Sequence, residues 1–232
     1  MPTALGVFAK YWEPGRAKTR LAQTIGAEKA AEIARLCLSC TLSRFSQVAD
    51  RSAVYFTPPD RQTEFSQACP KNWSLAPQGS GDLGQRMQNF FEQQFAQGAE
   101  RVVLIGSDSP DLPKEYISEA FEALKTMPVV LGPSEDGGYY LVGAAHQTPP
   151  IFENIAWSTP EVWPETVLKL KKDGLAYHSL PVWSDVDDGP SLQALLHRLQ
   201  EPDHGPNKGE AKDWQRKLRE EIEAVLRLPP RL

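Results

Sequence analysis

Short apolar runs alternate with longer amphipathic stretches along the first 200 residues. The runs at 4–9, 52–57 and 101–106 consist mainly of apolar residues, and RVVLIG (101–106) is the clearest of them. Uninterrupted apolar runs of this length are typical of strands buried on both faces of a parallel sheet. Further strands are expected at 128–133, 139–145 and 176–183.

The stretches between these runs have the 3.6-residue apolar spacing of helices that face a core. Helices are expected at 28–46, 82–97, 114–125, 161–174 and 191–199. Strands that alternate with helices predict right-handed crossovers and a mostly parallel sheet with helices on both faces, an α/β fold. The runs at 128–133 and 139–145 leave no room for a helix between them, so we expect one antiparallel pairing.

The composition changes after Leu199. Residues 201–210 are polar and rich in Pro and Gly, which predicts a linker, and 211–228 have the pattern of a charged amphipathic helix. We therefore expect one domain over 1–200, followed by a linker and C-terminal helix over 201–232. That helix could pack back on the domain or on a second subunit, which would make a homodimer, and the sequence does not choose between them.

Bulk composition narrows the class of function. With 232 residues, 41% hydrophobic and 24% charged, the chain can bury the core of one α/β domain. The net charge of −5 argues against nucleic-acid binding by phosphate neutralisation. No apolar run approaches the roughly 18–20 residues of a membrane span. The N-terminus lacks the pattern of a secretory signal. We expect a cytoplasmic protein with no nucleic-acid partner and no membrane span.

A cluster of cations follows the first expected strand. Ligands of open α/β sheets bind beyond the carboxyl ends of strands, and here Gly admits close backbone approach while Lys and Arg bind phosphate oxygens. The loop therefore predicts a nucleotide phosphate site, although it contains no Walker A motif. A solvated basic loop is the alternative. The residues concerned are Lys10, Gly15, Arg16, Lys18 and Arg20.

A second glycine-rich stretch, QGSGDLGQRM (78–87), opens the helix expected at 82–97. Backbone N–H groups at a helix N-terminus suit an anion or a nucleobase edge. We expect Gly81, Asp82 and Arg86 to contribute to nucleotide binding, while Asp82 fits a simple N-cap equally well.

Carboxylates follow two of the expected strands. Asp108 comes directly after 101–106, and SDVDDG (184–189) contains Asp185 and Asp187. A divalent cation that bridges a pyrophosphate needs only one or two protein carboxylates. We predict Mg²⁺ or Mn²⁺ held by Asp108 with Asp187, then Asp185 as second choice, provided that Asp108 and Asp187 lie within about 8 Å. Asp188 would point away and cap the 191–199 helix. A turn with a helix cap is the alternative.

Asp-Gly between two strand-like runs in GPSEDGGYYL (132–141) is a strong hairpin signal. Gly137, Gly138 and Tyr139 would also leave room for a substrate against the backbone, beside an aromatic face. Asp136 is the available carboxylate, either as a catalytic base or as an anchor for a hydroxyl group.

Trp157 and Thr159 precede another expected helix and are candidate substrate contacts, although Thr159 also fits a helix cap. The four histidines have no metal-ligand spacing, and no G-x-S-x-G motif is present. Zinc sites and hydrolytic triads are therefore poor candidates.

Six motifs occur in order along residues 4–199: KYWEPGRAKTRLA, QGSGDLGQRM, IGSDSPDLP, GPSEDGGYYLVG, WST and DVDDGPSL. Together they resemble a bacterial family of uncharacterised GT-A-like glycosyltransferases in the nucleotide-diphospho-sugar transferase superfamily. The GSDSP and DVD elements also resemble molybdenum-cofactor and phospholactate guanylyltransferases of that superfamily. The resemblance implies a Rossmann-like GT-A fold, a nucleotide bound by the first loop and a divalent metal on Asp108.

The sequence also departs from these patterns. Residues 106–108 read Gly-Ser-Asp in place of the usual D-x-D of glycosyltransferases, and the literal D-x-D is 185–187. The first loop lacks the G-G-x-x-x-R of the guanylyltransferases. We expect a metal-dependent transferase, with Asp108 and Asp136 catalytic, that moves a glycosyl group from a nucleotide sugar to an unknown acceptor. Nucleotidyl transfer from a nucleoside triphosphate, with release of pyrophosphate, and a non-catalytic nucleotide-binding regulator stay open.

Overall fold

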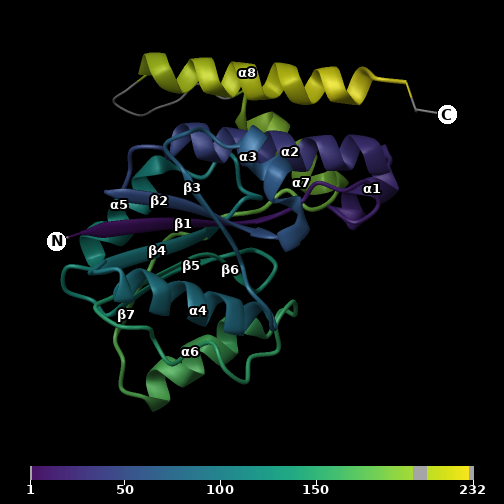
Figure 1. Cartoon of the computed structure of the whole chain (residues 1–232). Helices are drawn as coiled ribbons and strands as arrows, with labels where there is room; N and C mark the ends of the chain where they lie inside the picture. The colour runs from purple at the N-terminus through teal and green to yellow at the C-terminus, as the bar shows by residue number, and fades with distance from the viewer. Residues whose placement is uncertain (1, 201–207, 230–232) are drawn as a thin grey trace.

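The computed structural model of the chain describes residues 2–200 and 208–229, and its centre is a twisted sheet (Figure 1). Within these residues the sheet has seven strands in the order β3-β2-β1-β4-β6-β5-β7. They are β1 (Thr3–Lys10), β2 (Arg51–Thr57), β3 (Ser74–Pro77), β4 (Arg101–Gly106), β5 (Val129–Pro133), β6 (Tyr139–Ala145) and β7 (Tyr177–Ser179).

All of these strands are parallel except β6, which pairs antiparallel with both β4 and β5. The antiparallel pairing expected between 128–133 and 139–145 is therefore confirmed, and β6 adds a second one. The carboxyl ends of the parallel strands share one edge of the sheet, on the side of α1 and opposite the N-terminus in Figure 1.

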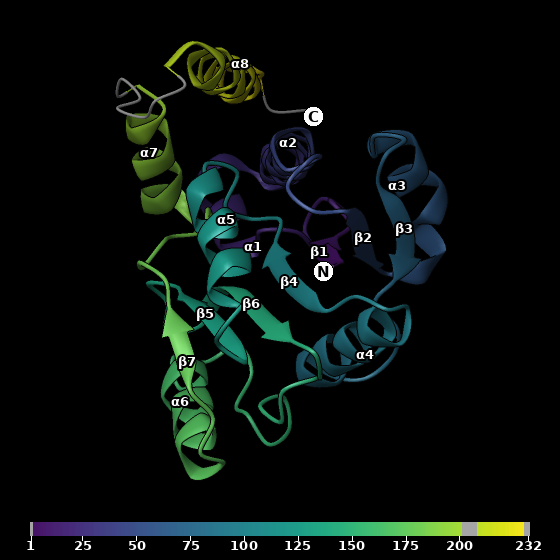
Figure 2. The same ribbon diagram turned by 90° about the vertical axis from the view of Figure 1, so that its left-hand side faces the viewer.

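Helices cover both faces, with α2, α3 and α5 on one side and α4 and α6 on the other (Figure 2). This layering confirms the predicted α/β Rossmann-like fold. The helical elements are α1 (Thr19–Ile25), α2 (Ala27–Arg44), η1 (Pro59–Arg61), α3 (Gln62–Ala68), α4 (Leu83–Ala96), α5 (Lys114–Ala123), α6 (Val162–Lys172), α7 (Gly189–Arg198) and α8 (Lys208–Arg227).

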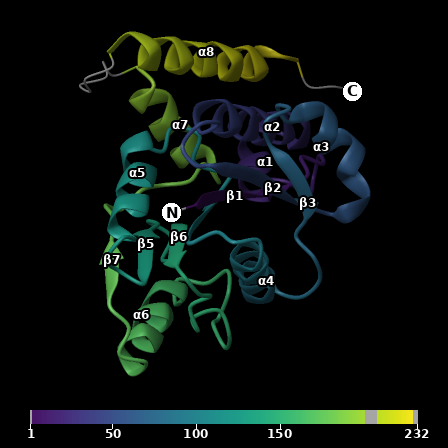
Figure 3. The same cartoon turned by 60° about the vertical axis from the view of Figure 1, so that its left-hand side comes forward.

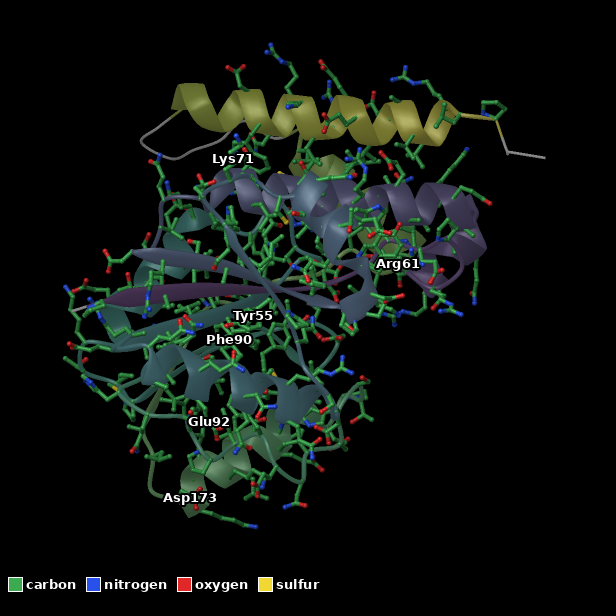
Figure 4. The ribbon with its side chains drawn as sticks, viewed as in Figure 1. Tyr55, Arg61, Lys71, Phe90, Glu92 and Asp173 are labelled. Atoms are coloured by element: carbon green, nitrogen blue, oxygen red, sulfur yellow. The ribbon has the colours of Figure 1, made fainter. Side chains whose placement is uncertain are left out.

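The side-chain alternation of β1 builds a core on each face. Leu5 and Val7 point toward α2 and α5, whereas Ala4 points toward α4. On the α4 side, the rings of Tyr55 and Phe90 meet edge to face with centroids 4.9 Å apart (Figure 4). Phe90 also lies over Gly6, where a Cβ would stand 2.4 Å from its ring, so this position of β1 has no room for a side chain.

Helix α8 packs back on the domain along α2 (Figure 3). Its Leu218, Ile222 and Val225 are buried in a cluster that α1, α2 and α7 complete. The Arg44 guanidinium lies 3.7 Å from the centroid of the Trp214 ring, a cation–π contact that joins the two helices. Of the two placements left open by the sequence, the structure has the intramolecular one.

Residues 201–207 of the expected linker lie outside the described residues. The C-terminal helix begins at Lys208, three residues before the expected start at 211. The division of the chain at residue 200 stays a prediction. None of the described helices combines the length and the apolar character needed to cross a membrane.

Some elements escaped prediction. Helices α1 and α3 have seven residues each and strand β3 has four, too short for a periodic pattern to develop. The strand expected at 176–183 is regular only over β7. Beyond it the chain still follows β5, because Trp183 N donates to Pro133 O at 3.1 Å, but Pro181 has no N–H to offer a ladder.

Candidate active site

The cationic loop after β1 forms one wall of a polar cavity of about 240 Å³ at the carboxyl edge of the sheet. Gly15 has φ 77°, a left-handed conformation that favours glycine, and the Lys10 ammonium donates to Arg16 O at 2.8 Å, which closes the loop on itself. The cavity is lined by Lys10, Arg16, Ala17, Lys18, Thr19, Arg20, Ala34, Ser107, Asp108 and Asp187. The predicted loop and the predicted carboxylates therefore face one space.

Two hydrogen bonds tie the late D-x-D segment to the end of β4. Val186 N donates to Asp108 O at 3.0 Å, and Ser109 Oγ donates to Ser184 O at 3.1 Å. Residues separated by more than 70 positions in sequence thus become neighbours just beyond Gly106. This is the physical reason that the carboxylates of both segments meet.

Lys18 joins the two carboxylates. Its ammonium donates to Asp108 Oδ1 and, at 2.7 Å, to Val186 O, and it lies 3.6 Å from Asp187 Oδ1. Arg20 Nη2 contacts the other oxygen of Asp187 at 2.8 Å. Because one ammonium touches both carboxylates, these are closer than the limit of about 8 Å set for one shared ion. The geometric condition is met, and the metal role stays a prediction.

Lys18 is buried between these groups, and its predicted contact with a nucleotide phosphate stays a prediction. Its side chain is 4% exposed, whereas that of Asp108 is 46% exposed. Burial lowers the pKa of Lys18, but the surrounding negative charge, with Asp108 foremost, outweighs burial and raises the pKa overall. The ammonium stays charged.

Asp185 has an unusual environment. Burial, and then the charges of Asp187, Asp136 and Asp108, raise its pKa to about 6. Four carboxylates thus share a small region, which includes the hairpin Asp136. Asp188 lies apart as predicted: it is the N-cap of α7, and its Oδ1 accepts from Ser191 N at 2.9 Å.

The donor set next to the cavity suits a hard divalent cation, since it offers the carboxylates of Asp108 and Asp187 and the carbonyl of Val186. Within the described ranges, no group of three or more His, Cys, Asp or Glu side chains has the geometry of a metal site. Magnesium is commonly bound by one or two carboxylates, with phosphate and water oxygens as its other ligands. The residues fit an ion that arrives with phosphate.

The polar side chains of the second glycine-rich stretch bond within the stretch itself. Asp82 is the N-cap of α4 and accepts from Gln85 N at 2.8 Å, so the simple alternative holds for its side chain. Arg86 Nε donates to Gly81 O at 3.0 Å, and its Nη1 lies 3.3 Å from Gln78 Oε1. Arg86 thus fastens this loop, and its predicted contact with a nucleotide stays untested.

Gln78 was missed by the sequence reasoning. Its amide donates to Ala9 O and Tyr55 O, which are backbone atoms of β1 and β2, and the side chain is buried. It joins two strand ends to Arg86. The residue follows β3, so it could only have been found had that short strand been recognised.

Gly137 lies in the hairpin at 134–138 with φ 90°, and a Cβ there would stand 2.5 Å from Pro160 O, so the segment before α6 lies against this glycine. Substrate contact by Gly137 and Gly138 stays a prediction. Asp136 is exposed, and its Oδ1 accepts from Gly138 N at 3.0 Å. Its charge is close enough to Asp185 to raise the pKa of that carboxyl.

Tyr139, Trp157 and Thr159 are the remaining substrate candidates. The rings of Tyr139 and Trp157 lie edge to face at 6.2 Å, and the Tyr139 hydroxyl is buried. Burial raises the pKa of Tyr139, and Thr166 faces its hydroxyl. Thr159 Oγ1 donates to Ala156 O at 2.7 Å and therefore stabilises a turn, although α6 begins at Val162 with Glu161 as N-cap. Substrate contact by these residues stays a prediction.

Comparison with known proteins found a matching family and similar solved structures. Residues 41–159 match a family described as an uncharacterized protein conserved in bacteria (DUF2064). A Desulfovibrio desulfuricans protein, provisionally named a nucleotide-diphospho-sugar transferase, is 31% identical with a TM-score of 0.84, and the match covers 97% of this chain and 96% of that one. No curated protein matches the chain.

Two solved structures of lower identity share the fold. A 4-diphosphocytidyl-2C-methyl-D-erythritol synthase from Anaerococcus prevotii is 10% identical, with a TM-score of 0.58 over 86% of this chain and 98% of that one. A nucleotidyl transferase from Methanothermobacter is 13% identical, with a TM-score of 0.57 over 84% of this chain and 95% of that one.

Proposed function

The chain belongs to the DUF2064 family, and from this premise and the geometry of its candidate site we propose that it is a transferase for nucleotide-activated substrates. In its specific form, the proposal is metal-dependent transfer of a glycosyl group from a nucleotide sugar to an acceptor hydroxyl. The provisional name of the Desulfovibrio desulfuricans relative supports this reading.

One observation carries the proposal. Cations from the loop after β1 and carboxylates from the segments after β4 and before α7 line the same cavity, at the carboxyl edge of the sheet. A diphosphate needs such cations for its oxygens, and the metal that accompanies it needs such carboxylates. A simple solvated loop would not place its charges against Asp108 and Asp187.

Exposed cations of the loop would bind the diphosphate, and the carboxylates would hold the metal. Arg16, with a side chain 77% exposed, would exchange its ion pair with Glu13 for a phosphate oxygen, and Lys10 would exchange its bond to Arg16 O. Arg20, at 60%, would likewise exchange Asp187 for a phosphate oxygen. Mg²⁺ or Mn²⁺ on Asp108 and Asp187 would supply positive charge where the leaving diphosphate develops negative charge.

Transfer breaks the bond between the anomeric carbon and the phosphate oxygen and forms a bond from that carbon to the acceptor oxygen. The acceptor hydroxyl loses its proton in this step, and Asp136 or Asp185 would accept it. Asp136 is exposed, whereas the raised pKa of Asp185, caused first by burial, suits a base near neutral pH.

A screen tests the proposal. Nucleotides and nucleotide sugars are assayed for thermal stabilisation with and without Mn²⁺, because a ligand of the native state raises its apparent stability. Each binding nucleotide sugar is then assayed for release of nucleoside diphosphate, with Asp108→Asn as control. Metal-dependent release supports glycosyl transfer. Release of pyrophosphate from a triphosphate would assign nucleotidyl transfer instead, and tight binding without turnover would assign a regulator.

A further inference from the structure

Lys18 adopts a backbone conformation that its residue type disfavours. It precedes α1 with φ 44° and ψ 54°, in the left-handed region, and its side chain is 4% exposed. A non-glycine residue in this region and a buried ammonium each cost free energy, and both persist only where the surroundings compensate. The function of Lys18 should therefore lie in what its ammonium touches.

The ammonium is surrounded by oxygen. Asp108 Oδ1 and Val186 O accept its hydrogen bonds, and Asp187 Oδ1 lies 3.6 Å away. Two carboxylates and a carbonyl are also the ligand type that a hard divalent cation takes. A lysine ammonium and such an ion would therefore compete for the same oxygens.

We propose that Lys18 is a tethered counter-cation, which occupies the gap between Asp108 and Asp187 and keeps a free divalent ion out until phosphate arrives. The assignment of these carboxylates to a metal rests on the proposed function. With the ammonium in place, one of the two negative charges of the carboxylate pair is neutralised and the space between them is filled, so the attraction for a second cation is reduced. A bound diphosphate brings negative charge that both attracts the metal and offers Lys18 new acceptors.

Arg20 differs from Lys18 in the exposure of its side chain. It also contacts Asp187, but its side chain is 60% exposed, so its ion pair is screened by solvent and easily exchanged. Lys18 is enclosed, so its charge acts on the carboxylates at short range and with little screening. Lys18 is therefore the cation whose removal should change metal affinity most.

The test measures Mn²⁺ binding without nucleotide, by electron paramagnetic resonance of the free ion. Lys18→Met removes the charge, and Lys18→Gln removes it while keeping an N–H donor for Asp108. Lys10→Met is the matched control, because Lys10 lines the same cavity but donates to Arg16 O. We expect weak binding by the wild type and by Lys10→Met, and binding at least about tenfold tighter by both Lys18 variants.

Thermal unfolding provides a second readout. Removal of the ammonium leaves Asp108 and Asp187 facing each other, so both Lys18 variants should unfold at a lower temperature than the wild type. Mn²⁺ should restore more of this temperature than it adds to the wild type, and the double variant Lys18→Met with Asp108→Asn should lose that restoration.

Three results would overturn the proposal: Mn²⁺ affinity in the Lys18 variants no higher than in the wild type, an equal gain in Lys10→Met, or Lys18 variants that stay unfolded at every Mn²⁺ concentration. None of these measurements uses a nucleotide sugar. A gain of Mn²⁺ affinity therefore stands even if no transfer reaction is found, and absence of the gain leaves the transferase proposal to its own assay.

Discussion

Asp111 and Arg198 form a buried ion pair, with Arg198 Nε 2.5 Å from Asp111 Oδ2. The Asp111 side chain is 5% exposed, and the guanidinium also lies 5.3 Å from the centroid of the Trp183 ring. The pair fastens the end of α7 to the segment after β4. Asp108, three positions earlier, instead lines the cavity. Two carboxylates of one short motif thus have different surroundings: Asp111 is buried in an ion pair, and Asp108 faces the candidate site.

Asp111→Ala should destabilise the protein without altering the site. Loss of one partner leaves the Arg198 charge poorly compensated, which costs about 3 kcal/mol for a buried pair, and the partial exposure of Arg198 places this case at about 2–3 kcal/mol. Urea denaturation measures the free energy of unfolding. Unchanged stability together with lost nucleotide binding would instead place Asp111 in the site.

Asp108→Asn should keep the fold and lose metal-dependent nucleotide binding. The amide retains an oxygen to accept from Lys18, but the buried ammonium loses the negative charge that compensates it most. The fold should therefore persist with a loss of about 1–3 kcal/mol in the free energy of unfolding. A metal ligand without charge should weaken binding in the presence of Mn²⁺ by about tenfold or more. Calorimetric titration of a nucleoside diphosphate with and without Mn²⁺ measures this. Undiminished metal dependence would leave Asp108 as a turn residue only.

The exposed arginines of the cationic loop should sense the number of phosphates. Arg16→Ala and Arg20→Ala each remove a charge-assisted hydrogen bond worth about 1.5–3 kcal/mol, so affinity should fall roughly ten- to a hundredfold for triphosphates and progressively less for di- and monophosphates. Arg35→Ala is the control, since Arg35 pairs with Glu32 on α2. Equal losses for all three ligand classes would remove the loop from the site.

Much of the architecture could be predicted, because long helices and buried strands show a recognisable spacing of apolar residues. The strand at 101–106, the helix at 82–97 and the cap Asp188 are observed where the pattern placed them. Which strand ends meet follows from topology, and this too was foreseen for Asp108 and Asp187.

The direction of individual side chains could not be predicted. Lys18 and Arg20 have the same charge and stand two residues apart, yet one is buried against Asp108 and the other is exposed. Lys18 has a left-handed backbone, and its ammonium is held by Asp108 and Val186 O; no periodic pattern encodes either feature. Gly137 is similar, because its missing Cβ makes room for Pro160, a residue distant in sequence.

Asp185→Asn should stabilise the protein above about pH 6 and have no effect below about pH 4. Burial, followed by the charges of Asp187, Asp136 and Asp108, raises the pKa of Asp185 to about 6. Between the unfolded and folded pKa values the native state binds more protons than the unfolded state, so wild-type stability falls as pH rises through this window.

The Asn variant lacks this loss, and the gain should be on the order of 1–3 kcal/mol at neutral pH. Urea denaturation from pH 4 to pH 8, with a chelator present to exclude metal, measures it. A difference between variant and wild type that does not vary with pH would show that Asp185 titrates normally.

The last prediction concerns Gly84, in the first turn of α4. An added Cβ would stand 2.2 Å from Phe152 O and 2.5 Å from Trp157 Nε1. Alanine favours a helix by up to about 1 kcal/mol over glycine, but overpacking against a backbone oxygen costs about 1–3 kcal/mol, so we expect Gly84→Ala to be destabilising. The segment that carries Trp157 would also have to move, which near-ultraviolet circular dichroism should detect. Gly106→Ala is the control, because its Cβ would meet only Asp108 N, at 4.0 Å, and stability should stay within about 0.5 kcal/mol. Equal stability of the two variants would mean that the segment around Trp157 is not seated on α4.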